Sequence, residues 1–321
     1  DKTGGDPDFI DFQCHDFSLR GMSGPEDAMR SGGGHLTQFI GSDTVPAIKH
    51  IYDIYQVPKG YLVGTSIPAT EHSVMCLGQK ETEIDTYKRL INDVYPSGMV
   101  SIVSDTWDFW KVITEFLPEL KDDIMARDGK VVIRPDSGDP VDIICGTKIS
   151  LGKLPEEKGL IECLWEIFGG TINDKGYKVL DSHIGAIYGD SITLSRAEAI
   201  LDKLEQKGFA STNIVFGVGS FTYQYLTRDT FGFAMKATAA VINGEVVQMF
   251  KDPKTGDGTK TSLKGFLKVS EDKEGNLHVQ DGLDRITKKD ALVPYIDEFT
   301  RASHSVGSFS KVRDRAIMSI K

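Results

Sequence analysis

The sequence repeatedly places a short apolar run directly before a polar turn, and a helix-like segment then follows. The clearest case is Val131-Val132-Ile133-Arg134, which ends in Pro135-Asp136-Ser137-Gly138. A buried strand of a parallel sheet has this pattern, because it is apolar throughout and delivers polar side chains at its carboxyl end. Similar runs end at Ser104-Asp105, at Gly189-Asp190 and at Gly217-Val218-Gly219-Ser220. Since the carboxyl ends of parallel strands meet at one edge of a sheet, we expect one shared polar site.

Strand-like and helix-like segments alternate at least six times before residue 230, which is typical of parallel βαβ units with right-handed crossovers. We expect strands at residues 9–12, 35–40, 61–63, 99–103, 130–134, 184–188 and 214–216. Farther along, short strands are separated by Asn243-Gly244 and by Glu274-Gly275-Asn276, which are hairpin signals. The sequence therefore predicts an α/β barrel over residues 1–230 and a mainly antiparallel β portion, packed on the barrel, over residues 231–321.

The bulk composition excludes several classes of function. With 321 residues, 40% of them hydrophobic and 26% charged, the chain is of ordinary globular type. Its net charge of −10 argues against a nucleic-acid partner, so an anionic ligand must be held by local positive groups. No apolar run reaches membrane-spanning length, and we expect no membrane partner. We interpret the four scattered cysteines as reduced thiols of a cytoplasmic protein.

A histidine lies where a strand end meets the start of a helix, in the pair Glu71-His72. A carboxylate at its Nδ1 atom, from the neighbouring residue or from Asp105, would leave Nε2 free for proton transfer or nucleophilic attack. The simpler alternative is a surface histidine with local hydrogen bonds.

Two further strand ends suit a sugar phosphate. Backbone N–H groups at Gly219 and Ser220 can form an anion site, to which Arg228 would add charge from the helix that follows. A plain tight turn is the alternative. Asp136 and Asp190 suit a ribose diol or a hydrated Mg²⁺, although aspartate at these places is also a common helix N-cap.

An aromatic ring and a guanidinium lie together in the turn between His15 and Gly21. Phe17 beside Arg20 suits a flat heteroaromatic ligand next to an anionic group. Taken alone, Phe17 is better explained as a core residue.

Together these motifs resemble the nicotinamide phosphoribosyltransferases, which belong to the type II phosphoribosyltransferases. The resemblance runs in register from about Phe12 to beyond Pro253. It rests on His15-Asp16-Phe17, Arg20-Gly21, Gly41-Ser42-Asp43-Thr44-Val45, Ser66-Ile67-Pro68-Ala69-Thr70-Glu71-His72-Ser73, Val103-Ser104-Asp105, Ile133-Arg134-Pro135-Asp136-Ser137-Gly138, Tyr188-Gly189-Asp190 and Leu226-Thr227-Arg228-Asp229.

The resemblance implies an irregular parallel α/β barrel with a smaller, largely antiparallel β satellite domain. It implies that nicotinamide and 5-phosphoribosyl 1-pyrophosphate react, with Mg²⁺, to give nicotinamide mononucleotide and pyrophosphate in NAD salvage. ATP would stimulate this reaction through a phosphorylated histidine. Members of the family are homodimers with active sites at the interface. They also carry an N-terminal segment before the point where this chain begins.

The same resemblance assigns roles around the reacting groups. His72 would be the phosphorylated histidine, oriented by Asp105 with Glu71 adjacent. Phe17 would stack on the pyridine ring. Asp43 would accept the carboxamide NH₂.

Other roles concern the rest of the ligands. Ser66 would be a substrate-binding residue, while Arg20 and Arg134 would lie along the path of nicotinamide and phosphate. Asp136, Gly189 and Asp190 would hold the ribose hydroxyls. Gly219, Ser220 and Arg228 would bind the 5′-phosphate, and Lys236 would reach the nucleotide phosphates. The resemblance does not identify the Mg²⁺ ligands.

Two positions depart from the family pattern, and two alternative functions also remain open. Ser220 stands where a glycine is expected, and Ser18-Leu19 replaces a glycine–aromatic pair beside Phe17. One alternative is a nicotinate phosphoribosyltransferase, against which Asp43 argues because it would repel a second carboxylate. The other is a non-catalytic protein that binds the mononucleotide without turnover.

Overall fold

The computed structural model describes residues 2–189, 191–227, 230, 232, 234–254, 262–285, 296–297, 302–303 and 309–318. The chain divides into two compact units, of which the first comprises residues 1–236 and 251–262. The second comprises residues 237–250 and 263–321. The predicted boundary followed residue 230. In the structure the first unit continues to Lys236 and also includes residues 251–262.

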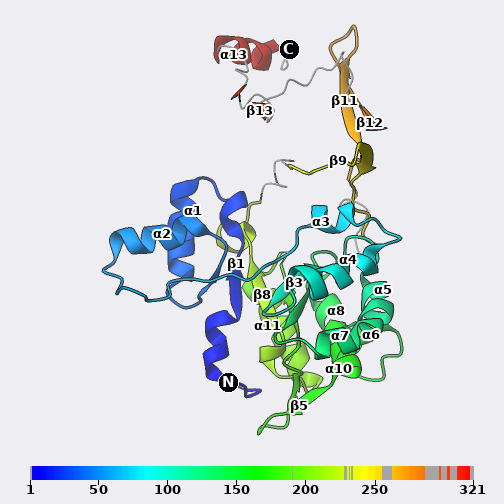
Figure 1. Cartoon of the computed structure of the whole chain (residues 1–321). Helices are drawn as coiled ribbons and strands as arrows, with labels where there is room; N and C mark the ends of the chain where they lie inside the picture. The colour runs from blue at the N-terminus through cyan, green and yellow to red at the C-terminus, as the bar shows by residue number, and fades with distance from the viewer. Residues whose placement is uncertain are drawn as a thin grey trace. The chain divides into compact units, whose positions relative to one another are not determined.

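A parallel sheet of six strands forms the centre of the first unit, in the order β2-β1-β8-β7-β4-β3 (Figure 1). All five neighbouring pairs are parallel. The strands are β1 (Cys14–Asp16), β2 (Gly41–Ser42), β3 (Val100–Val103), β4 (Val131–Arg134), β7 (Ile184–Tyr188) and β8 (Val215–Val218). A separate antiparallel pair is formed by β5 (Gly170–Ile172) and β6 (Lys178–Leu180).

One extended segment connects the two edges of this sheet. Thr65 forms a parallel bridge with Gly41 of β2, and Ala69 forms one with Ser101 of β3. Backbone hydrogen bonds of 2.9 Å from Ser42 N to Thr65 O and from Ser101 N to Pro68 O accompany these bridges. The six strands form a curled half-barrel whose two edges are bridged by this segment, and this arrangement confirms the predicted α/β fold class.

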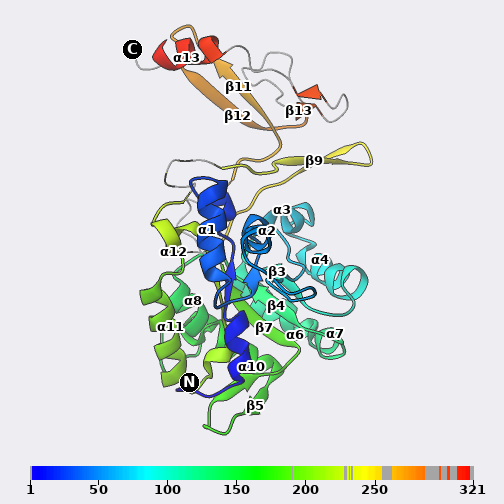
Figure 2. The same cartoon turned by 90° about the vertical axis from the view of Figure 1, so that its left-hand side faces the viewer.

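Helices surround the strands, as Figure 2 shows for α8 and α11 on one side and α4, α6 and α7 on the other. The α-helices of the first unit are α1 (Pro25–His35), α2 (Val45–Ile54), α3 (His72–Leu77), α4 (Glu83–Arg89), α5 (Phe109–Lys111), α6 (Leu117–Glu119), α7 (Lys121–Met125), α8 (Pro140–Cys145), α9 (Pro155–Lys158), α10 (Leu160–Phe168), α11 (Leu194–Gln206) and α12 (Ser220–Gln224). Short 3₁₀ helices are η1 (Pro7–Phe12), η2 (Ser18–Gly21) and η5 (Ser211–Asn213), and π-helical turns are η3 (Leu90–Val94) and η4 (Val112–Phe116).

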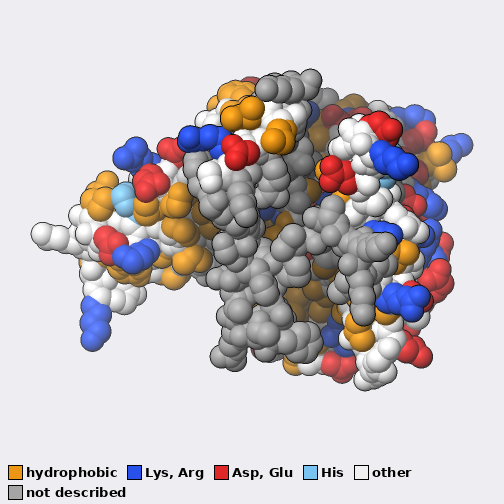
Figure 3. Space-filling model, turned by 90° about the horizontal axis from the view of Figure 1, so that it is seen from above, with side chains coloured by type: hydrophobic (Ala, Val, Ile, Leu, Met, Phe, Trp, Pro, Cys, Tyr) orange, Lys and Arg blue, Asp and Glu red, His pale blue; other side chains and the backbone are white. Residues whose placement is uncertain are grey.

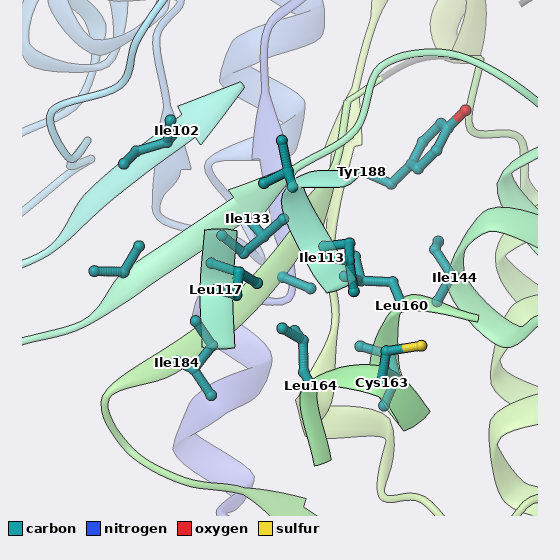
Figure 4. Packing of buried hydrophobic residues seen from close by; sticks show 14 of the residues in the cluster. Ile102, Ile113, Leu117, Ile133, Ile144, Leu160, Cys163, Leu164, Ile184 and Tyr188 are labelled. Carbon is teal, nitrogen blue, oxygen red and sulfur yellow. The ribbon is translucent and has the colours of Figure 1, made fainter. Parts of the chain in front are cut away.

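The core lies between the sheet and the helices that cover it. Figure 4 shows Ile102, Ile133 and Ile184 of the strands beside side chains of η4, α6 and α10. Ile102 and Ile133 are fully buried. Each such side chain contributes roughly 1.5–3 kcal/mol by leaving water. Continuous burial along β3 and β4 explains why these strands are apolar throughout, and it positions their polar ends at one edge.

Three early strands were predicted wrongly in position or extent. Residues 9–12 lie in η1, where Pro7 begins the turn and Asp6 caps it, and the strand follows at Cys14. His35, the predicted start of the next strand, ends α1, and its Nε2 atom lies 2.8 Å from Gly41 O. Residues 61–63 form no strand.

The second unit contains antiparallel hairpins, as predicted. Strands β9 (Ala239–Ile242) and β10 (Glu245–Gln248) are joined at Asn243-Gly244, whose positive φ angles of 52° and 85° suit this tight turn. Strands β11 (Phe266–Glu271) and β12 (Leu277–Leu283) form the next hairpin. The described parts that remain are β13 (Ile296–Asp297), β14 (Ala302–Ser303) and α13 (Phe309–Met318).

Helices α1 and α2 form one part of the first unit, which lies at the left of Figure 3. Apolar side chains are exposed on the surface of this part. They include Tyr52, Ile54, Tyr55 and Tyr61, each more than half exposed. A shallow groove of about 260 Å³ lies between α2 and the chain that follows it. Among the described residues, no helix combines the length and the apolar character needed to cross a membrane.

Candidate functional site

The polar ends of neighbouring strands do meet around one histidine. His72 begins α3, Asp105 follows β3, and Asp136 follows β4. The Nε2 atom of His72 lies 3.8 Å from Asp105 Oδ1 and 3.8 Å from Asp136 Oδ2. Arg134, the last residue of β4, places its Nε atom 3.8 Å from Asp136 Oδ2 and donates from Nη2 to Thr70 O at 2.5 Å. The structure thus gathers four predicted residues from three separate elements.

The orientation of the His72 ring differs from the predicted one. Nδ1 contacts the hydroxyl of Thr106 at 3.0 Å, rather than a carboxylate. Nε2 faces the ammonium of Lys251 at 3.1 Å. An ammonium has only donors, so Nε2 accepts this hydrogen bond and Nδ1 carries the ring proton. Thr106 takes the place predicted for a carboxylate because the Asp105 side chain lies on the Nε2 side of the ring.

The surroundings keep His72 neutral. Burial lowers the pKa of His72 to about 4, and the positive charge of Lys251 acts in the same direction. Asp136 opposes this effect, while Arg134 adds to it. A neutral imidazole has a free electron pair, so the ring is chemically able to act as a nucleophile or a base near neutral pH.

Lys251 was not among the predicted site residues, because the lysine-rich stretch at 251–264 has the composition of a solvated loop. The backbone holds that segment on the barrel: Asp252 N donates to Thr106 O at 3.1 Å, and Lys254 N donates to Trp107 O at 3.0 Å. No local pattern could have shown the contact with His72, since 179 residues separate the two along the chain.

The two predicted partners of His72 have different environments. Glu71 is the N-cap of α3, and its Oε2 atom accepts from Ser73 N at 2.7 Å. Burial would raise the pKa of Glu71, but the hydrogen bonds from Ser73 outweigh this and hold the pKa below its usual range. Asp105 is completely buried, and neither of its carboxylate oxygens has a hydrogen-bond partner among the described residues.

Asp43 forms a second polar group with Ser66 and His15. Its Oδ1 atom accepts from the Ser66 hydroxyl at 2.5 Å and lies 3.2 Å from His15 Nε2. Burial alone would raise the pKa of Asp43, yet the contacts with His15 and Ser66 outweigh burial and lower it. The carboxylate is therefore ionised, and its 46% exposed side chain remains accessible to a ligand. His15 was not predicted as a site residue, although it lies in the motif that identified Phe17.

Phe17 lies against two glycines at the ends of β7 and β8. A Cβ atom added to Gly217 would fall 2.6 Å from Phe17 Cε2, and one added to Gly189 would fall 2.8 Å from Asp136 Oδ1. The ring centroids of Phe17 and His15 are 4.7 Å apart. The glycines therefore make room for Phe17 between the Asp43 group and the His72 group.

The structure does not bring every predicted residue into this arrangement. Asp190 and Arg228 lie outside the described residues. Arg20, in η2, and Lys236 are exposed, and no hydrogen bond or ion pair joins either to the described site residues. The roles predicted for these four positions stay predictions.

The turn that was predicted to bind phosphate differs in part from the prediction. Gly219 is the N-cap of α12 and Ser220 is its first, buried residue. The helix was predicted to continue to Arg228, but it ends at Gln224, because Tyr225 adopts a left-handed conformation with φ of 55°.

A broad surface hollow of about 850 Å³ lies elsewhere on the first unit. Its lining includes Asp108, Asp139, Asp142 and Glu156, and none of the predicted site residues lines it. A mainly acidic hollow is a poor site for phosphates.

Comparison with known proteins agrees with the resemblance that the motifs show. The model of the nicotinate phosphoribosyltransferase (NAPRTase) family matches residues 12–289, which is most of the chain. The chain belongs to this family. It is 56% identical over 280 residues to a nicotinamide phosphoribosyltransferase of Acinetobacter baylyi, an alignment that covers 85% of this chain and 55% of the relative.

Two further relatives carry the same name. The chain is 44% identical over 268 residues to a nicotinamide phosphoribosyltransferase of Mycoplasma pneumoniae, covering 82% of this chain and 55% of the relative. It is 36% identical over 300 residues to one of Xanthomonas campestris pv. campestris, covering 91% of this chain and 60% of the relative. The chain thus spans little more than half the length of the curated relatives that it matches.

Proposed function

We propose that this chain provides the barrel of a nicotinamide phosphoribosyltransferase, which forms nicotinamide mononucleotide and pyrophosphate from nicotinamide and 5-phosphoribosyl 1-pyrophosphate in NAD salvage. The observation that carries the proposal is the arrangement of Phe17 between Asp43 and the His72 group. An aromatic face next to an exposed carboxylate suits a flat ring that bears an amide. Relatives named for this activity support the same substrate.

The ionised Asp43 accounts for selection of the amide. Ser66 and His15 both contact Oδ1, so the carboxylate is held in one orientation. It accepts an N–H of the nicotinamide carboxamide. Nicotinate would instead bring a second negative charge to this position and be repelled.

Positive groups near His72 suit the leaving pyrophosphate. As the bond from the ribose to pyrophosphate breaks, negative charge develops on the leaving group and positive charge on the sugar. Arg134 and Lys251 stabilise the negative charge on pyrophosphate, and Asp136 accepts hydrogen bonds from the ribose hydroxyls. The barrel places these groups in advance, so little reorganisation is needed during the reaction.

We also propose that His72 accepts a phosphoryl group from ATP. Its Nε2 atom has an electron pair and forms a bond to the γ-phosphorus, while the bond from that phosphorus to ADP breaks and ADP leaves. Lys251, already 3.1 Å from Nε2, stabilises the added phosphoryl oxygens. Phosphorylation thereby replaces the Lys251–His72 contact with a stronger, charge-assisted one.

Mg²⁺ and a second subunit belong to the same proposal. Mg²⁺ in such sites is bound by one or two carboxylates together with substrate phosphates, and the described carboxylates around His72 are compatible with this. The ion would neutralise pyrophosphate charge; its ligands stay unassigned. The homodimer and the cytoplasmic location are retained as predictions, the latter in keeping with four unpaired cysteines.

The test offers equal amounts of nicotinamide and nicotinate, with 5-phosphoribosyl 1-pyrophosphate and Mg²⁺, and identifies the mononucleotide by mass spectrometry. It uses the chain alone and the chain joined to the N-terminal segment of the Acinetobacter baylyi relative. We expect only the amide product. Mainly acid product would favour the nicotinate alternative. Mononucleotide binding without either product, for both proteins, would favour the non-catalytic alternative.

A further inference from the structure

One residue is attached to both sides of the contact between His72 and Lys251. The hydroxyl of Thr106 lies 3.0 Å from His72 Nδ1, and the backbone carbonyl of Thr106 accepts from Asp252 N at 3.1 Å. Asp252 directly follows Lys251, whose ammonium lies 3.1 Å from His72 Nε2. Thr106 is fully buried, so water does not compete for either contact. Its side chain therefore holds the imidazole ring, while its backbone holds the segment that brings the ammonium.

The residues that follow Thr106 strengthen the attachment of this segment. Lys254 N donates to Trp107 O at 3.0 Å, and the ammonium of Lys254 is paired with the carboxylate of Asp108. These contacts, like the one from Asp252 N, do not involve the side chain of Thr106. A substitution that changes only the Thr106 hydroxyl therefore leaves the segment that carries Lys251 in place.

The backbone beside His72 is also fixed independently of the Thr106 side chain. Thr70 N donates to Ser101 O at 2.9 Å, and the Thr70 hydroxyl accepts from Val103 N at 2.9 Å. The chain just before His72 is thereby attached to β3, and Glu71 caps the helix that His72 begins. What these contacts do not fix is the orientation of the imidazole ring.

The ring of His72 is oriented by one contact at each nitrogen. Among the described residues, Thr106 is the partner within hydrogen-bond distance of Nδ1, and Lys251 is the partner of Nε2. Asp105 and Asp136 are each 3.8 Å from Nε2, which is beyond hydrogen-bond distance. Since the ammonium can only donate, Nε2 keeps its electron pair and Nδ1–H donates to the Thr106 hydroxyl.

We propose that Thr106 is a positioning residue, whose hydroxyl holds the Nδ1 proton of His72 and thereby directs the electron pair of Nε2 toward the incoming phosphoryl group. The proposal deepens the proposed function and rests on it, because His72 is the phosphoryl acceptor there. As Nε2 forms its bond to phosphorus, the bond from phosphorus to ADP breaks, ADP leaves with that electron pair, and the ring becomes positively charged. The proton stays on Nδ1, where its hydrogen bond to Thr106 becomes charge-assisted and stronger.

The first measurement needs no ATP and no turnover. Long-range ¹H–¹⁵N NMR spectra of the unmodified chain show which ring nitrogen of His72 carries the proton, with the signals assigned by their absence in His72→Ala. We expect the proton on Nδ1 near neutral pH. A proton on Nε2 would overturn the proposal, because the Thr106 hydroxyl would then have to donate to Nδ1 instead of holding its proton.

The second measurement separates the hydroxyl of Thr106 from the shape of its side chain. Thr106→Val keeps nearly the same shape without a hydrogen-bonding group, and Thr106→Ser keeps the hydroxyl. Thr3→Val is the matched control, because Thr3 is also buried and its hydroxyl both donates to Ser211 Oγ at 3.2 Å and accepts from Ser211 N at 3.0 Å. Labelling of the protein by the γ-phosphate of ATP should be at least about tenfold slower in Thr106→Val, but within about threefold of the unmodified rate in Thr106→Ser and Thr3→Val.

The spectra of the variants exclude a merely structural role. Thr106→Val should show a mixture of ring tautomers while its thermal unfolding stays cooperative, and Thr106→Ser should show only the Nδ1–H form. Normal labelling of Thr106→Val, or equally slow labelling of Thr106→Ser, would overturn the proposal. If Thr106→Val does not fold, the tautomer of the unmodified chain and the labelling of Thr106→Ser still decide.

Failure of the proposed function gives a different result. A chain that is not labelled by ATP, yet shows the Nδ1–H form of His72 and loses it in Thr106→Val, would contradict the proposed phosphoryl transfer. The control of the His72 ring by Thr106 would stand in that case.

Discussion

Gly217 and Phe17 are in such close contact that no larger residue fits at position 217: a Cβ atom there would fall 2.6 Å from Phe17 Cε2. The same atom would fall 2.5 Å from Gly189 Cα, so the ring cannot simply shift toward the neighbouring strand end. The place of the aromatic ring is therefore decided by two glycines that lie far from it in sequence.

Gly217→Ala should displace Phe17 and weaken nicotinamide binding about tenfold, since aromatic stacking is worth roughly 0.5–1.5 kcal/mol and misplacement removes it. The change in KM for nicotinamide, or in Kd measured by calorimetry, tests this. Gly34→Ala is the control, because nothing lies within 4 Å of a Cβ atom there. Equal affinities in Gly217→Ala and the unmodified chain would show that Phe17 does not contact the ligand.

Asp43→Ser should reduce the preference for nicotinamide over nicotinate by at least about tenfold. The substitution removes both a charge-assisted hydrogen bond, worth roughly 1.5–3 kcal/mol, and the repulsion of the acid. The ratio of kcat/KM for the two substrates measures the effect. Asp53→Ser removes an exposed carboxylate of α2 and should leave that ratio unchanged. A ratio that is the same in Asp43→Ser would assign discrimination to another residue.

His72→Ala should abolish transfer of radiolabel from the γ-phosphate of ATP to the protein, because the only proposed acceptor is removed. Synthesis without ATP should continue at a lower rate. His50→Ala, on α2, serves as the control and should be labelled normally. Undiminished labelling of His72→Ala would place the phosphoryl group on a different residue.

The stability of the first unit should decrease as the pH falls from about 6.5 to about 4. Because burial lowers the pKa of His72 to about 4 from 6.5, the unfolded chain binds the proton more readily than the folded chain in this interval. The loss from this group is about 3 kcal/mol. Lys251→Met should make this loss of stability smaller, since Lys251 helps to lower the pKa of His72. Lys59→Met, at an exposed position, should leave the loss unchanged. Urea denaturation at several pH values would show the difference, and parallel curves for all three proteins would contradict it.

Lys207→Met should destabilise the first unit by about 3 kcal/mol. The side chain of Lys207 is 3% exposed, and its ammonium is ion-paired with Glu162 at 2.6 Å. It also donates to the carbonyl oxygens of Cys145, Lys148 and Lys158. Removing it leaves a half-buried carboxylate and several carbonyls unpaired.

Lys203→Met, one turn earlier on α11, is the control for this substitution. Its ammonium forms a single ion pair among the described residues, 3.4 Å from Asp142, and its removal should cost less than about 1 kcal/mol. Thermal unfolding compares the two variants, and equal losses would show that the contacts of Lys207 add nothing.

The strand ends illustrate what a local pattern can predict. The strand predicted at residues 184–188 forms as Ile184–Tyr188, and those predicted near 99–103 and 130–134 form within a residue or two. These strands are buried on both faces, so their apolar runs are continuous and end abruptly at polar residues. Because parallel strands end at one edge, the meeting of His72, Asp105 and Asp136 follows from the pattern of the sequence.

The errors fall where neighbours in space outweigh the local pattern. Phe9 and Phe12 are typical strand residues. They nevertheless lie in a 3₁₀ helix that begins at Pro7 with Asp6 as its N-cap, and the strand begins only at Cys14. The helix after Ser220 ends early because Tyr225 takes a left-handed conformation that no residue in its pattern predicts.

The sequence by itself determined the parallel α/β architecture, the family and the residues that the strand ends deliver, because apolar periodicity and motifs are local properties of the chain. Tertiary structure alone decided that Nε2 of His72 faces Lys251 and that Thr106, rather than a carboxylate, contacts Nδ1. It also decided that His15 contacts the carboxylate of Asp43. Each of these contacts joins residues from different elements, and their geometry depends on how the whole barrel closes.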